Sequence, residues 1–246
     1  MSASLIKSSL ESAPQPAAGE SLPGWVRELS HAYVSGTTCQ FVLHGNVYDL
    51  VRSPTGGDSR YIPLADFLSN QIFGKWNLVL LYDLSRGLRP LAGTNPARLR
   101  EMVDLFSERL GEVKALPRDP TSVLLMLDRF FEKLLVESAD LSKTLSVAVI
   151  IDYAKYVAPA LPPGGAPREI NTNLVTLLNW AQSPYLKRIN AAFILVAEKL
   201  SDLNPRLVRN PHVLSIEIPF PDESQRQEYI EWAASDMDFS SRCEFT

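Results

Sequence analysis

Apolar residues recur along this chain with two different spacings, which predict alternating strands and helices. Four short, almost continuous apolar runs are typical of strands buried on both faces of a sheet, and they lie at residues 39–43, 78–82, 147–151 and 193–196. A fifth strand is predicted over residues 212–218, where apolar and polar residues alternate. Helical spacing predicts helices over residues 23–36, 63–73, 96–110, 121–137, 170–181, 202–209 and 222–234.

This order of elements predicts an α/β fold. Five strands separated by helical segments favour a three-layer αβα sandwich, in which a five-stranded, mostly parallel sheet is covered by helices on both faces. Binding sites in such sheets form where strands end and the following loops turn away. We therefore expect a site near Gly45, Asp83, Asp152 and Glu198.

The two parts of the chain differ in composition. Residues 1–22 are rich in Ser, Ala, Pro and Glu and lack the apolar segment of a signal peptide, so they are predicted to form a disordered N-terminal tail. Residues 23–246 are predicted to form the folded domain. Within it, residues 52–58, 86–95 and 158–167 are predicted as loops because they contain Gly and Pro.

Composition and charge narrow the classes of function. The chain has 246 residues, of which 46% are hydrophobic, enough for a substantial core. Its formal net charge of -4 disfavours a nucleic-acid partner, and no apolar run approaches the roughly 18 residues needed to cross a bilayer. The two cysteines, Cys39 and Cys243, do not predict a disulfide framework, which favours a reducing, cytoplasmic location.

Asp152 is the sharpest chemical signal in the sequence. It follows the apolar run 147–151, and a buried strand would hold its carboxylate rigidly enough to orient Mg²⁺ through water. This pattern resembles the Walker B motif of P-loop ATPases. Many strands also end in Asp simply to cap the next turn, and this alternative stays open.

The region from residue 147 to 232 resembles the AAA+ ATPase family. After the strand at 193–196 come Asn204-Pro205-Arg206-Leu207-Val208-Arg209, and then Pro219-Phe220-Pro221-Asp222 leads into a helix. The resemblance implies a P-loop-type α/β fold with Asp152 as the Walker B residue. It also implies an arginine finger at Arg209, or at Arg206, that acts on a neighbouring module in an oligomer. A solvated helix face is the alternative for both arginines.

The same region and the first strand depart from the family pattern. No Gly-Lys-Thr or Gly-Lys-Ser follows residues 41–43, and only Gly45 and Asn46 are placed to contact a nucleotide, with Asp152 to hold Mg²⁺. Tyr153 stands where a catalytic Glu is expected, and a phenol is a poor base at neutral pH. Ala197-Glu198-Lys199 replaces the polar sensor, and His212 stands in place of a second arginine.

These departures predict a module that has lost catalysis. We expect the degenerate, N-terminal module of a tandem AAA-type ATPase, with its helical lid truncated or missing, that serves assembly, substrate binding or regulation. ATP and Mg²⁺ would then be bound elsewhere in the parent protein or by a neighbouring module. The expected partners are further copies, an adjacent AAA+ module or a protein substrate, with no nucleic acid and no membrane.

Three alternatives remain for the function. The first is an active ATPase with an atypical phosphate loop at residues 44–49. The second is a clamp-loader-like subunit, against which the acidic balance and the short C-terminus count. The third is an unrelated α/β enzyme that binds a metal through Asp83 and Asp152.

Overall fold

The structure is a computed structural model that describes residues 22–53, 61–112, 116–137, 145–161, 165–187 and 189–235. Residues 1–21 of the predicted tail lie outside these ranges, as do Gly56 and Gly57 of one predicted loop, residues 162–164 of another, and Cys243. Leu22, the last residue of the predicted tail, packs against the hydrophobic core.

A six-stranded sheet, in the order β5-β4-β6-β7-β1-β8, forms the centre of the fold. Five strands are parallel: β1 (Gln40–Gly45), β4 (Leu78–Asp83), β6 (Val147–Ile151), β7 (Ala191–Val196) and β8 (Val213–Ile218). Every residue of β6 and β7 is buried, which explains why their sequences are apolar at each position. The predicted α/β fold class is therefore confirmed.

The main sheet has one strand more than predicted. The sixth strand, β5 (Gly87–Pro90), pairs antiparallel with β4 inside the segment predicted as a loop. Its four residues include Gly and Pro, which usually mark loops. Pro90 is tolerated here because β5 lies at the edge of the sheet, where one side of its backbone needs no partner.

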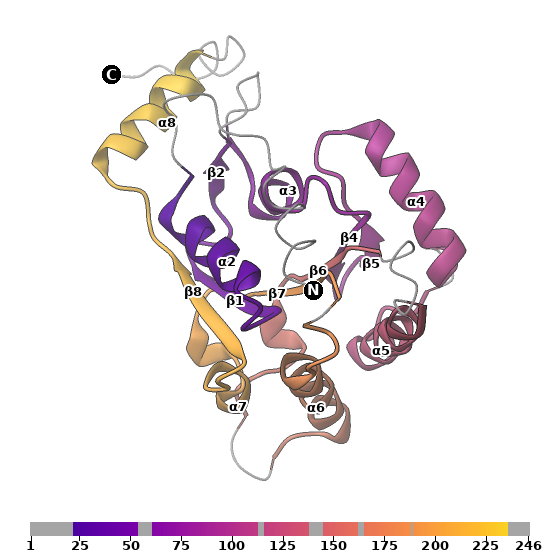
Figure 1. Cartoon of the computed structure of the whole chain (residues 1–246). Coiled ribbons are helices and arrows are strands. Elements are labelled where there is room, and N and C mark those ends of the chain that lie inside the picture. Colours follow the sequence, from indigo (N-terminus) through magenta and orange to yellow (C-terminus); the bar gives the residue numbers. More distant parts are fainter. Residues whose placement is uncertain are drawn as a thin grey trace.

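Helices cover both faces of this sheet (Figure 1). On one face lie α2 (Gly24–Val34) and α3 (Leu64–Phe67), which continues as a π-helix, η1 (Leu68–Ile72). On the other lie α5 (Pro120–Glu137), α6 (Arg168–Gln182) and α7 (Pro205–Val208), while α4 (Pro96–Leu110) flanks the β4–β5 edge. Two 3₁₀ turns, η4 (Ala154–Tyr156) and η5 (Leu200–Asp202), follow β6 and β7.

Two helices begin at residues whose side chains cap them. The Asn95 side chain accepts hydrogen bonds from the N–H groups of Ala97 and Arg98, as expected for an N-cap. The Asp222 carboxylate accepts from the N–H of Gln225, whose side chain accepts from the Asp222 N–H in return. This reciprocal pair begins α8 (Glu223–Ser235), a helix that extends away from the body of the molecule (Figure 1).

An aromatic cluster fixes the helical layer beneath the sheet. Trp180 of α6 stacks on Phe193 of β7 with ring centroids 4.7 Å apart, and Phe131 of α5 contacts both rings. The indole N–H of Trp180 donates to Asp128 at 2.7 Å. Among the described residues, no helix has the length and apolar character to span a bilayer.

Candidate functional site

The carboxyl ends of β1, β4, β6 and β7 meet at one edge of the sheet. The N–H of Gly45, at the end of β1, donates to the carbonyl oxygen of Glu198 just beyond β7, at 3.0 Å. The N–H of Asp152, just beyond β6, donates to the carbonyl oxygen of Tyr82 in β4, at 2.9 Å. The strand-end residues singled out in the sequence therefore lie around one edge, which we call the carboxyl edge.

The backbone amides directly after β1 are already hydrogen-bonded within the protein. Besides the Gly45 bond, the N–H of Asn46 donates to the carbonyl oxygen of Ile218 at 2.9 Å, and that of Val47 to the carbonyl oxygen of Gly45 at 2.9 Å. A phosphate-binding loop instead points successive N–H groups at its ligand. In this chain the corresponding three donors are directed at carbonyl oxygens.

Gly45 allows this loop to lie close against β8. Its φ of +92° is in the region that favours glycine, and a Cβ at this position would lie 2.6 Å from the carbonyl oxygen of Ile218. The glycine is therefore explained by a turn and a close backbone approach. It was predicted as a nucleotide contact, and the structure gives it this local role.

No helix begins at the end of β1. The chain continues into a small antiparallel ribbon of β2 (Leu50–Arg52) and β3 (Tyr61–Pro63) before α3 begins at Leu64. In a P-loop protein the strand is followed by a helix whose N-terminus faces the phosphates, so that the partial positive charge of the helix dipole attracts them. The carboxyl edge lacks that contribution beside β1.

Asp152 lies partly buried at this edge, in surroundings that disfavour its charge. Burial raises the pKa of its carboxyl group, and the negative charge of Asp83 raises it further, although the N–H of Tyr153 donates to Oδ1 at 2.8 Å and opposes the shift. The nearby phenol of Tyr48 also opposes the shift and lowers the pKa of this carboxyl group. Burial and the nearby negative charge of Asp152 in turn raise the pKa of the Tyr48 phenol.

Two tyrosine rings stack on each other beside this carboxylate. Tyr48, from the loop after β1, stacks on Tyr153 with ring centroids 4.9 Å apart and an interplanar angle of 22°. Tyr153 is the one non-glycine residue of the described chain with a positive φ, 51°, a left-handed conformation that costs energy and directs its ring towards Tyr48. Both residues are 43% exposed, so the pair forms an aromatic surface at the carboxyl edge.

Asp83 is engaged by its own turn. Its carboxylate accepts from the N–H groups of Ser85 and Arg86 and forms an ion pair with Arg89 at 2.8 Å. Although burial opposes it, these hydrogen bonds lower the pKa of Asp83. Within the described ranges no group of three His, Cys, Asp or Glu side chains is arranged to hold a metal ion, so Asp83 and Asp152 have no third ligand of these types.

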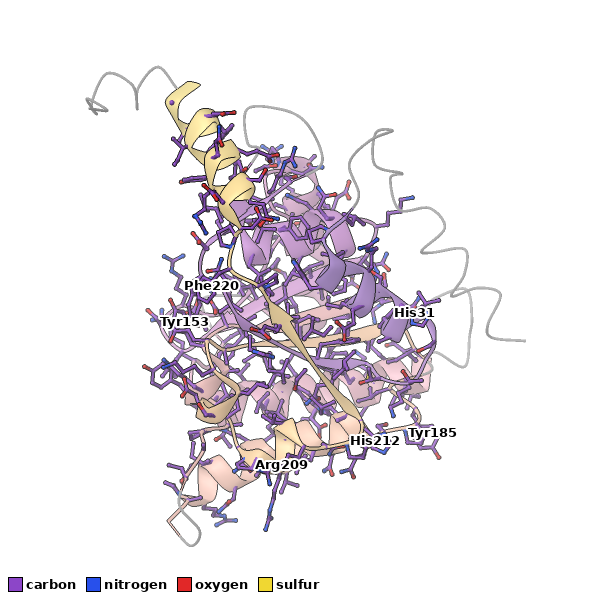
Figure 2. The ribbon with its side chains drawn as sticks, turned by 90° about the vertical axis from the view of Figure 1, so that its left-hand side faces the viewer. His31, Tyr153, Tyr185, Arg209, His212 and Phe220 are labelled. Atoms are coloured by element: carbon purple, nitrogen blue, oxygen red, sulfur yellow. The ribbon has the colours of Figure 1, made fainter. Side chains whose placement is uncertain are left out.

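The two candidate finger arginines lie at the opposite edge of the sheet. Arg206 and Arg209 flank a groove of about 530 Å³ that is also lined by Gln182 and His212. The carbonyl oxygen of His212 accepts from the hydroxyl of Thr38, just before β1, which places this groove at the amino ends of the strands. Figure 2 shows Arg209 well separated from Tyr153. Neither arginine can therefore contribute to a site at Asp152 of its own chain.

Sequence reasoning missed the interaction between the two tyrosines. It considered Tyr48 as part of a possible phosphate loop at residues 44–49 and Tyr153 only as a poor substitute for a catalytic base. An available signal was that each tyrosine follows a strand closely, and that carboxyl ends of parallel strands meet at one edge. The backbone bonds of Gly45 and Asn46 had no such signal, because they depend on which strands are neighbours.

A parallel sheet in this order, covered by helices and with an acidic residue after a central strand, is the architecture of the AAA+ class of P-loop proteins. A family model described as "AAA+ chaperone, N-terminal Rossmann-like domain" matches residues 14–219, and the chain belongs to this family. The predicted resemblance to AAA+ proteins is thus confirmed.

Among solved structures, the fold is similar to a chain of the E. coli MS115-1 HORMA:CdnC:Trip13 complex. The TM-score is 0.50 and the sequence identity 14%, and the match covers 96% of this chain and 65% of that chain. This chain therefore spans less than two thirds of its neighbour's length, and the likeness concerns the fold. A search of curated proteins finds no match.

Proposed function

We propose that this AAA+ remodelling module is non-catalytic, and that it serves assembly, substrate binding or regulation beside an active ATPase module. The observation that carries the proposal is the state of the carboxyl edge after β1. Three successive amides are bonded to carbonyl oxygens there, and a stacked tyrosine pair lies beside Asp152.

Electrostatics supports the same conclusion. A bound triphosphate needs cations and N–H donors, and it repels carboxylates. The residues around this edge include Asp49, Asp152 and Glu198, and Lys155 is already paired with Glu198 at 3.6 Å. Binding of ATP here would first require breaking backbone hydrogen bonds and displacing Tyr48, with little charge compensation in return.

The proposed partners are proteins. Arg206 and Arg209 are exposed at the edge opposite Asp152, where they are available only to another module. In that position an arginine can stabilise the charge that develops on a phosphate bound next door. ATP and Mg²⁺ would accordingly be bound by the neighbour. The solved neighbour structure, which contains HORMA and CdnC proteins beside Trip13, is consistent with a protein client.

Titration calorimetry with Mg-ATP and Mg-ADP tests the catalytic part of this proposal. We expect no saturable binding up to about 1 mM nucleotide, a weak limit that corresponds to only about 4 kcal/mol of binding free energy. We also expect no release of phosphate above the rate of a buffer control.

The Asp152→Ala variant makes the measurement decisive. If the wild-type chain binds Mg-ATP with micromolar affinity and this variant does not, the module is an active nucleotide site and the proposal is wrong. Tyr185→Ala, an exposed substitution between α6 and β7 and away from Tyr153 (Figure 2), is the control for nonspecific loss of binding.

A further inference from the structure

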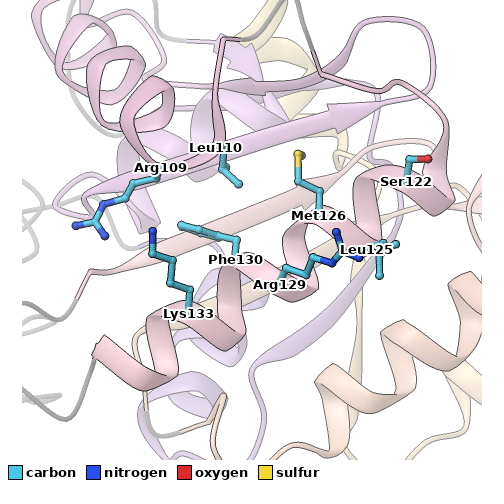
Figure 3. A pocket seen from close by; sticks show the side chains of 8 residues that line it. All are labelled: Arg109, Leu110, Ser122, Leu125, Met126, Arg129, Phe130 and Lys133. Atoms are coloured by element: carbon cyan, nitrogen blue, oxygen red, sulfur yellow. The ribbon is translucent and has the colours of Figure 1, made fainter.

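A groove between α4 and α5 combines an apolar floor with a cationic rim (Figure 3). Its volume is about 430 Å³. Leu110, Met126 and Phe130 form the apolar part, while Arg109, Arg129 and Lys133 supply three positive charges. The groove lies on the β4–β5 side of the sheet, far from the carboxyl edge residues of β1.

Two of these cations form no ion pair with a described residue. Arg109 is paired with Glu137 at 2.8 Å, but within the described ranges no ion pair or hydrogen bond involves the side chains of Arg129 or Lys133. They are exposed and lie four residues apart on one face of α5, where like charges repel each other. This concentration of positive charge occurs in a chain with a net charge of -4, so it is a local feature and not a general property of the surface.

Exposed apolar side chains extend the same face of α5 at both ends. Leu125 is 49% exposed and lies four residues before Arg129, and Val136 is 78% exposed and lies three residues after Lys133. These spacings place all four side chains along one stripe of the helix. The stripe therefore fits an amphipathic helix with both carboxylates and an aliphatic side chain on its outer face.

The outward face of α8 has this chemistry. Tyr229 and Trp232 turn towards the body, where both contact Tyr61. Helical periodicity then places Glu223, Gln227, Ile230, Glu231 and Ala234 on the opposite face, and all five are exposed. Ile230 is 54% exposed and lies between the two carboxylates. With its 13 residues α8 is roughly 20 Å long, which is shorter than the roughly 27 Å of α5 along which it would lie.

The groove and α8 are on opposite sides of the molecule. The chain enters α8 from β8 at one edge of the sheet and enters α4 from β5 at the other edge, and Figure 1 shows the two elements far apart. Because α8 cannot reach the groove of its own chain, we propose that it docks in the α4–α5 groove of a second copy. Such a contact joins two different surfaces and so repeats from copy to copy, which closes into a ring or extends as a filament.

Mixing two charge-reversed variants of the full chain tests this contact. The groove variant carries Arg129→Glu and Lys133→Glu, and the helix variant carries Glu223→Lys and Glu231→Lys. By sedimentation velocity, wild-type protein should associate at about 100 µM in low salt, and the association should weaken as salt screens the charges. Each variant alone should associate at least about tenfold more weakly, because equal charges then face each other. The equimolar mixture should recover association, because each helix then meets a groove of opposite charge.

A control variant with Arg27→Glu and Arg168→Glu changes the net charge by the same amount as the groove variant. Both positions are exposed and lie outside the groove, so this control should associate like the wild type. Three results would each overturn the contact. The wild-type chain could be monomeric at about 100 µM, or the single variants could associate normally. The mixture could also stay dissociated while circular dichroism shows that both variants are folded. The inference rests on the proposed assembly role, but the two fail separately: nucleotide binding would refute the non-catalytic module and leave this sedimentation result unaffected.

Discussion

At the scale of single residues, Asp152 is a carboxylate whose surroundings oppose its ionisation. Because burial and Asp83 raise its pKa in the folded state, the folded chain holds this proton to a higher pH than the unfolded chain does. The free energy of unfolding therefore loses a contribution as pH rises through the interval between the two pKa values. Asp152→Asn removes that loss, and its amide oxygen can still accept the hydrogen bond from the N–H of Tyr153.

We expect Asp152→Asn to be at least as stable as the wild type at pH 7, with a gain of about 1.4 kcal/mol for each unit by which the pKa is raised. The gain should vanish below the ordinary carboxyl range. Urea unfolding at several pH values measures this difference. Asp119→Asn is the control and should change stability at pH 7 in the opposite direction, because the N–H of Ser122 lowers the pKa of Asp119. A variant at position 152 that loses stability at pH 7 would show that the charge is favoured there.

The sequence identified Asp152 correctly as a strand-end acid, but it did not indicate what surrounds it. A carboxylate after an apolar run is a local pattern, so it can be read from adjacent residues. The tyrosine pair and the bonds of Gly45 and Asn46 join residues more than 100 positions apart along the chain. Which of these meet depends on the strand order, and the order is not encoded in any short pattern.

At the scale of elements, α8 packs only lightly against the other elements that the structure describes. The Tyr61 ring contacts Tyr229 and Trp232 with centroid distances of 5.0 Å each, and Arg52 forms an ion pair with Glu228 at 3.2 Å. These contacts join α8 to the β2–β3 ribbon. A helix held by so few contacts unfolds locally at a lower free energy than the central strands do.

Tyr61→Ala should therefore release α8 while leaving the sheet intact. Two aromatic contacts together contribute about 1 to 3 kcal/mol, so amide hydrogen exchange over residues 223–235 should accelerate about 5- to 150-fold. Exchange in β6 and β7 should not change. Tyr185→Ala, at a ring that is 62% exposed, controls for the loss of a surface tyrosine. Equal exchange of α8 in wild type and Tyr61→Ala would show that other contacts hold this helix.

The elements that the sequence predicted well are long or strongly apolar. The helix over residues 96–110 was predicted with its observed bounds because Asn95 and Pro96 mark its start. The missed elements, β5 and the β2–β3 ribbon, have three or four residues each and contain or adjoin Gly and Pro. Their pairing comes from neighbouring strands, which provide hydrogen bonds that local propensity does not reveal.

At the scale of the whole molecule, the strand order determines the chemistry of the carboxyl edge. β1 lies between β7 and β8, so the loop after β1 meets carbonyl oxygens on both sides, from Glu198 and from Ile218. The occupied amides and the stacked tyrosine pair are thus separate obstacles to a phosphate. The amides are held by the backbone of three strands, whereas the tyrosine pair consists of two side chains.

Replacing Tyr48 of the tyrosine pair by alanine should consequently fail to create a nucleotide site. A site with a Kd of about 10 µM would add about 4 kcal/mol of stability in about 5 mM Mg-ATP, and would raise the melting temperature on the order of 10 °C. We expect a change below about 1 °C for both the wild type and Tyr48→Ala, because Gly45, Asn46 and Val47 keep their hydrogen bonds in the variant. Magnesium sulfate at the same concentration controls for ionic effects in the thermal scan. A shift that is specific to Mg-ATP and confined to Tyr48→Ala would mean that the ring alone excludes the nucleotide and that the amides can turn outward.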